Sequence, residues 1–120
     1  MPAGHQTLWN EFVSEAQEHL ATVGEDLLAL EKYGADEARQ SVDRLFRAMH
    51  SVKGGAGLVG CRQIGALAHT METILDRLRQ GRLELRPEVM DGLLAGNDLM
   101  QFQRAPKQRQ RLGGTTFLEH

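Results

Sequence analysis

Apolar residues recur at intervals of three and four positions through most of the first hundred residues, and this rhythm constrains the fold most strongly. Three amphipathic stripes show this spacing of apolar residues, over residues 9–30, 38–56 and 64–78. A fourth helix is predicted to begin at Pro87, because proline suits the first helical position, where its missing N–H would have no partner. No segment alternates apolar and polar residues over the length of a strand, so the pattern does not support a β-sheet.

Short connections join these stripes, so neighbouring helices should run antiparallel. The predicted fold class is all-α, an antiparallel up-down four-helix bundle in which each stripe is buried against the other three. The first stripe predicts one continuous helix that stops near Gly34. We assign residues 7–101 to the bundle, residues 1–6 to a flexible N-terminus and residues 102–120 to a linker or tail. Whether that tail holds an extra helix is left open, as is a vector origin for its last residues.

Composition is typical of a single-domain cytoplasmic protein. The 120 residues leave room for one domain, and charged residues make up an ordinary 25%. The formal net charge of −2 argues against a nucleic-acid binder, and no apolar run approaches the roughly 18 residues of a membrane span. The N-terminal residues lack the pattern of an export signal. Cys61 is the single cysteine, which excludes an internal disulfide and a cysteine-based zinc site.

Four polar side chains are expected to meet at the edge of the bundle. His50 and His69 each stand one residue past a core position on consecutive predicted helices. When these helices fold back through a turn centred near residues 59–60, His50 lies level with His69 and Glu72 to within about one helical turn. Lys53 follows His50 by three positions, as Glu72 follows His69, so each pair shares a helix face. The other three histidines are expected at the chain ends or on the surface.

A glycine run follows His50 and is unusual for a helix. Gly54, Gly55 and Gly57 each cost a helix interior roughly 1 kcal/mol relative to alanine. One use is access, because a partner or an anionic group can approach His50 closely where side chains are absent. The alternative is that glycines end the helix and allow tight packing, which could be all that Gly57 does. For Gly54 and Gly55 we favour access.

The motif resembles that of a known family. Residues 50–57 read HSVKGGAG and are preceded by LFRAM at 45–49, while AHTME follows at 68–72. This pattern resembles the histidine-containing phosphotransfer (HPt) domain, and within that family the N-terminal domain of CheA-type chemotaxis histidine kinases. The similarity covers about residues 7–101, and a motif of this length is far more specific than a lone histidine.

The resemblance implies a function for each of these residues. The histidine matching His50 accepts the γ-phosphoryl group of ATP from a separate kinase catalytic domain and passes it to an aspartate of a response-regulator receiver domain. The residues matching Lys53 and His69 lie beside it, and the carboxylate matching Glu72 hydrogen-bonds its ring. The family binds no cofactor or metal in this domain, since ATP and Mg belong to the kinase domain. Such domains are expected to be monomeric in isolation, and CheA-type members commonly carry a fifth helix.

The chemistry of the residues agrees with that role. If Glu72 accepts a hydrogen bond from Nδ1–H of His50, Nε2 is left unprotonated and able to attack phosphorus. Lys53 would offer an ammonium group to the phosphoryl oxygens. His69 could either contact the phosphoryl group or hold Glu72, and the sequence does not choose. The chain has no Walker A motif or kinase glycine loop, so we expect a phosphoryl carrier with no catalytic activity alone. The resemblance implies that it is a fragment of a CheA-type autokinase.

Four other hypotheses compete with this one. The chain could be the phosphotransfer domain of a hybrid kinase outside chemotaxis, or a non-catalytic helical interaction bundle. Two histidines and Glu72 could bind a metal ion, but the ammonium of Lys53 opposes this. A hydrolase based on Ser51 is weaker still, because no nucleophile-elbow pattern surrounds that serine.

Overall fold

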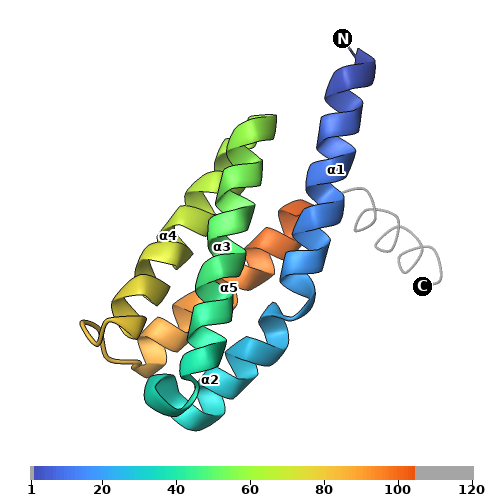
Figure 1. The fold of residues 1–120 in the computed structure, drawn as a ribbon. Helices are drawn as coiled ribbons and strands as arrows, with labels where there is room; N and C mark the ends of the chain where they lie inside the picture. The colour runs from blue at the N-terminus through green and yellow to red at the C-terminus, as the bar shows by residue number, and fades with distance from the viewer. Residues whose placement is uncertain (1, 105–120) are drawn as a thin grey trace, which may run out of the picture.

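The computed structural model describes residues 2–104, with the backbone alone for residues 2–5 and 102–104. Within this range the chain is all-α and contains no strand, as the sequence predicted. The described residues form five helices (Figure 1), which are α1 Pro2–Ala21, α2 Val23–Glu37, α3 Arg39–Val59, α4 Arg62–Arg79 and α5 Pro87–Arg104. None of these helices is both long and apolar enough to cross a membrane.

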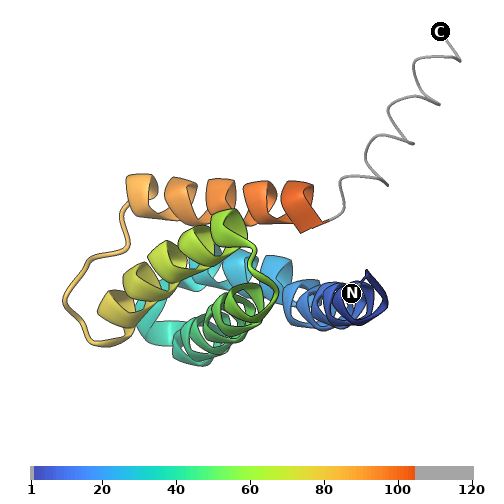
Figure 2. The same cartoon turned by 90° about the horizontal axis from the view of Figure 1, so that it is seen from above.

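The helices pack as a bundle with four sides. α3 and α4 form an antiparallel hairpin, α1 and α2 together line the other side of α3, and α5 packs against α4 and α2 (Figures 1 and 2). Over the described residues α3 and α5 make no close backbone approach, so they lie on opposite corners. The segment α1–α2 thus fills one corner of the predicted four-helix arrangement.

The predicted stripes form the core. Each helix contributes apolar side chains to one cluster, and the largest that are fully buried are Leu27, Leu30, Leu45, Met49, Met71, Leu75, Leu93 and Met100. Burial of these stripes against one another drives the packing, because none of the helices would be stable alone.

The first stripe differs from the prediction because it forms two helices. The chain bends at Thr22, which separates α1 from α2. Each half has its own attachment to α3: Phe12 of α1 packs over Gly55, and buried Asp26 of α2 accepts a two-pronged ion pair from Arg44 at 2.8 Å. The bend lets one continuous stripe follow α3 along its whole length.

The helix ends also depart from the prediction in part. Helix α1 begins at Pro2, within the segment assigned to a flexible N-terminus. The regular part of α2 stops at Gly34, as predicted, because Gly34 has φ 84° and ψ 168°.

The turn between α3 and α4 sets the register of the hairpin. Helix α3 continues through the glycine run to Val59 and is closed by Gly60, whose φ of 76° places it in the left-handed region. The N–H groups of Gly60 and Cys61 donate to carbonyls at the end of α3, as in other glycine-capped helices. The hairpin therefore folds about residues 60–61, close to the predicted centre.

The last helix begins at Pro87 as predicted and reaches Arg104, three residues beyond the predicted end of the bundle. The predictions made for the tail, which concern a linker, an extra helix and vector residues, otherwise fall on residues 105–120 and lie outside the described residues.

Candidate functional site

His50 projects from the middle of α3 at the rim of the bundle. Its side chain is 64% exposed, although the preceding residue, Met49, is fully buried. The one-residue offset from the core stripe produces this placement, because successive residues on a helix point about 100° apart. The imidazole is therefore accessible to a docking protein.

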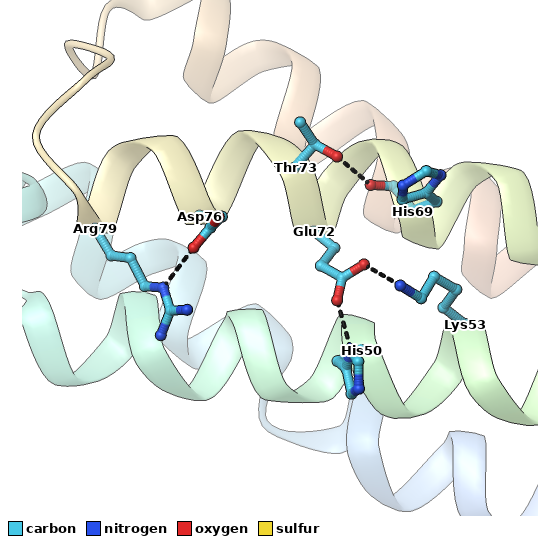
Figure 3. A network of polar contacts seen from close by, with 7 residues as sticks. All are labelled: His50, Lys53, His69, Glu72, Thr73, Asp76 and Arg79. Carbon is cyan, nitrogen blue, oxygen red and sulfur yellow. Dashed lines mark hydrogen bonds and ion pairs between the residues drawn. The ribbon is translucent and has the colours of Figure 1, made fainter.

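Glu72 of α4 faces His50 across the hairpin. Its carboxylate accepts hydrogen bonds at both oxygens, from His50 Nδ1 to Oε2 at 2.5 Å and from Lys53 Nζ to Oε1 at 2.6 Å (Figure 3). The Glu72 side chain is only 10% exposed. A buried carboxylate needs such partners, since charge without compensation in the interior is unfavourable.

The hydrogen bonds decide the ionisation of Glu72. Burial raises the pKa of Glu72, but the hydrogen bonds and positive charge of Lys53 and His50 more than offset this, so the pKa lies below its ordinary value of 4.5. Glu72 is thus ionised near neutral pH and can only accept hydrogen bonds. It follows that Nδ1 of His50 carries a hydrogen, so Nε2 is the unprotonated nitrogen whenever the ring is neutral.

Lys53 sits one turn after His50 and is half-buried, with 35% of its side chain exposed. The sequence predicted that its ammonium would face phosphoryl oxygens. In the structure the ammonium donates to Glu72, at the same carboxylate as His50 (Figure 3). An ammonium has three donors, so the bond to Glu72 leaves others to meet an anion.

His69 lies on α4, one turn before Glu72, and is exposed. Over the described residues its ring makes no hydrogen bond, and its backbone carbonyl accepts one from Thr73 Oγ1 at 3.0 Å (Figure 3). Of the two roles left open for His69, holding Glu72 has no contact in this structure to support it.

The glycines divide into two kinds. A Cβ added at Gly54 or Gly57 would meet nothing within 4 Å, so α3 is bare on the exposed side that carries His50. A Cβ at Gly55 would lie 2.8 Å from Cδ1 of Phe12. The access hypothesis is therefore wrong for Gly55, whose small size instead allows α1 to pack closely on α3.

A neighbour of His50 and a residue that contacts this neighbour were not predicted to belong to the site. The ring of Phe46, one turn earlier on α3, stacks with the imidazole at a centroid separation of 6.2 Å. The guanidinium of Arg79, from the end of α4, lies 4.0 Å from the centre of the Phe46 ring. The four-residue spacing of Phe46 and His50 could have indicated the first contact, but no sequence signal indicated the second.

The metal-site hypothesis has no geometric support. Among the side chains that the structure describes, no group of three histidine, cysteine, aspartate or glutamate residues is arranged to hold a metal ion. His50 and Glu72 are close, but the cation near them is the ammonium of Lys53.

Comparison with known families agrees with the arrangement of the site. The model of the Hpt domain matches residues 7–105, which include all the helical elements that carry the site. This chain belongs to the Hpt domain family. Membership favours a phosphotransfer domain over a purely structural bundle.

Known relatives of this Hpt domain are chemotaxis proteins. It is 38% identical over 87 residues to the chemotaxis protein CheA of Halobacterium salinarum, covering 72% of this chain and 13% of that protein. Identity to CheA of Salmonella typhimurium is 36% over 95 residues, covering 79% of this chain and 14% of the relative. CheA of Treponema pallidum is 29% identical over 119 residues, which is 99% of this chain and 14% of the relative. The chain is thus an Hpt phosphotransfer domain related to the CheA chemotaxis kinase, and spans about a seventh of each relative's length.

Proposed function

We propose that His50 is the phosphoacceptor of a chemotaxis-like two-component system. It receives the γ-phosphoryl group of ATP from a separate histidine kinase domain and passes it to an aspartate of a response-regulator receiver. The observation that carries this proposal is the exposed imidazole whose Nδ1 donates to a buried, ionised carboxylate. Such a ring presents an unprotonated Nε2 to a partner.

The first transfer joins His50 to phosphorus. The lone pair of Nε2 attacks the γ-phosphorus, the N–P bond forms, and the bond between phosphorus and the bridging oxygen breaks with its electrons leaving on ADP. The ring gains positive charge in this step, and the carboxylate of Glu72 at Nδ1 stabilises that charge.

The second transfer reverses the bond change at His50. A carboxylate oxygen of the receiver aspartate attacks phosphorus, the N–P bond breaks, and its electron pair returns to Nε2. Because Nδ1 keeps its hydrogen throughout, the ring ends in the tautomer in which it began.

Lys53 is suited to the charge of the transferred group. Its ammonium lies at the same carboxylate as His50, and spare donors can meet phosphoryl oxygens when the group arrives. We assign His69, whose exposed ring is nearby on α4, to contact with the phosphoryl group.

The partners follow from the donor and acceptor. The kinase's ATP-binding domain would hold ATP and Mg, so this domain needs neither, and the use of ATP suits a cytoplasmic setting. The similarity to chemotaxis CheA proteins favours a chemotaxis-like pathway over a hybrid-kinase phosphorelay of another kind.

The decisive test labels the domain with radioactive ATP and a CheA-type kinase catalytic core. The wild-type domain should gain acid-labile, base-stable label, as expected of a phosphoramidate, and His50→Gln should gain none while its helical circular dichroism is unchanged. His19→Gln, which alters a half-buried histidine of α1, is the matched control and should be labelled normally. Label that persists in His50→Gln would reject His50 as the acceptor.

A further inference from the structure

The exposure of His50 leaves its orientation weakly determined by packing. With 64% of the side chain in solvent, few atoms of the core restrict rotation about its two side-chain bonds. The hydrogen bond to Glu72 fixes one ring atom, but a bond at a single atom still allows the ring plane to tilt. A second contact is needed to hold the plane.

Phe46 makes that second contact. Its ring lies nearly parallel to the imidazole, with 18° between the planes and 6.2 Å between the centroids, as in an offset stack. Phe46 is half-buried and packs against the core on its inner side. Phe46 therefore connects the packed core to the exposed imidazole ring.

Arg79 in turn holds Phe46 from α4. The guanidinium lies over the Phe46 ring at 4.0 Å from its centre, a cation–π distance. Two carboxylates anchor the guanidinium, Asp76 at 2.8 Å from Nε and Asp43 at 3.9 Å from Nη1 (Figure 3 shows the contact with Asp76). The contact reaches across the hairpin, as the hydrogen bond to Glu72 does about two turns earlier on α4.

We propose that Phe46, held by Arg79, is a positioning residue for the imidazole of His50. The inference rests on the proposed function, because it concerns the same nucleophile. Glu72 fixes the ring by its Nδ1 atom and Phe46 fixes it by its plane. Together they aim Nε2 in one direction before any partner arrives, which reduces the orientational freedom that must be lost at the transition state.

The test uses phosphoramidate, a small donor whose P–N bond breaks with release of ammonia as phosphorus bonds to Nε2. Because it needs no protein docking, its rate reports on the imidazole alone. Phe46→Leu keeps an apolar side chain but removes the flat ring, and we expect labelling of His50 to slow about three- to tenfold. Phe46→Tyr restores a flat ring and should stay within about twofold of the wild type.

A nuclear magnetic resonance readout separates positioning from general destabilisation. In the wild type, the ring current of Phe46 should displace the carbon-bound proton resonances of the His50 ring, and Phe46→Leu should remove that displacement while Phe46→Tyr keeps it. Arg79→Gln leaves the Phe46 ring in place but removes its anchor, so we expect a partial change in both rate and resonances. If Phe46→Leu does not fold, the rate and resonances of Arg79→Gln test the positioning role in its place.

Wild-type rates and unchanged His50 resonances in Phe46→Leu, or in Arg79→Gln if the former does not fold, would overturn the positioning role. Failure of the proposed function has a different signature. In that case the wild-type domain is not labelled at His50 by either donor, whatever the resonances show.

Discussion

Glu72 connects two other polar side chains of the site, His50 and Lys53, through one carboxylate. Each of its oxygens has a nitrogen partner, one from His50 and one from Lys53. Neither partner could be replaced by water without a loss, because only 10% of the side chain is exposed. In the proposed function Glu72 serves stability and chemistry together, since the bonds that keep its carboxylate ionised also determine which nitrogen of His50 is free.

This coupling predicts a pH-dependent contribution of Glu72 to stability. The folded-state pKa lies below the ordinary value of 4.5, so the unfolded chain binds more protons at this site on acidification. The contribution should be complete above the ordinary value and be lost as the pH falls from there through the folded-state pKa. In urea unfolding between about pH 2.5 and 7, the free energy of unfolding of Glu72→Gln should therefore fall less steeply on acidification than that of the wild type.

Glu15→Gln is a suitable control, because Glu15 is exposed on α1 and should leave the acid limb of the profile as in the wild type. The Glu72→Gln domain should also accept phosphoryl on the order of tenfold more slowly, since a neutral amide stabilises the growing charge of the ring less. If the free energy of unfolding falls equally steeply on acidification in the wild type and in Glu72→Gln, the bonds to Glu72 are weak in solution.

The two sides of helix α3 must meet different structural requirements. Its inner side must accept the close approach of α1, and its outer side carries the exposed His50. Glycines meet both requirements, Gly55 beneath Phe12 and Gly54 in open space beside the site. They remain helical because the surrounding bundle stabilises α3 despite its low helix propensity.

Alanine substitutions at these two positions should act in opposite directions. Gly54→Ala should stabilise the domain by about 0.5–1 kcal/mol, because the added methyl group meets nothing and alanine favours the helix. Gly55→Ala should destabilise it by about 1–3 kcal/mol, because the methyl group would lie 2.8 Å from the Phe12 ring. Urea unfolding of the two variants measures both effects.

Gly54→Ala also tests the access hypothesis, which remains a prediction for Gly54. If a partner approaches over this position, Gly54→Ala should slow transfer from the kinase domain and leave phosphoramidate labelling as in the wild type. Equal kinase rates for Gly54→Ala and wild type would remove access as the reason for this glycine. Destabilisation by Gly54→Ala would contradict the open space seen beside it.

The site lies on the surface of the molecule, and the bundle as a whole holds its two helices in place. The four polar groups come from two helices that touch along their whole length, and the other helices bury the opposite side of that hairpin. Side chains such as Leu45 and Leu75, both fully buried, hold α3 and α4 at the spacing that brings His50 to Glu72. Loss of core packing should therefore affect the entire domain.

A matched pair of leucines on α3 measures this dependence. Leu45→Ala should destabilise the domain by about 2–5 kcal/mol, because it opens a cavity at a fully buried position. Leu58→Ala, at a position that is 74% exposed, should change stability by no more than about 0.5 kcal/mol. Thermal unfolding followed by circular dichroism distinguishes them, and similar transition temperatures would mean that Leu45 is not part of the core in solution.

The periodic pattern of the sequence was enough to predict the helical class, the buried stripes and the start of α5 at Pro87. It also brought His50 level with Glu72, because both the helical repeat and the length of a short turn are local properties of the chain. The contact between their side chains therefore agrees with an estimate made from residue numbers alone.

Only the tertiary structure decided how these helices meet. The bend at Thr22 depends on two separate attachments to α3, and the role of Gly55 depends on where Phe12 lies. The contact of Arg79 with Phe46 likewise depends on the crossing of α3 and α4 and on side-chain rotamers. The physical reason is that the period of a helix is set by residues within four positions, whereas contacts between helices depend on the packing of the whole core.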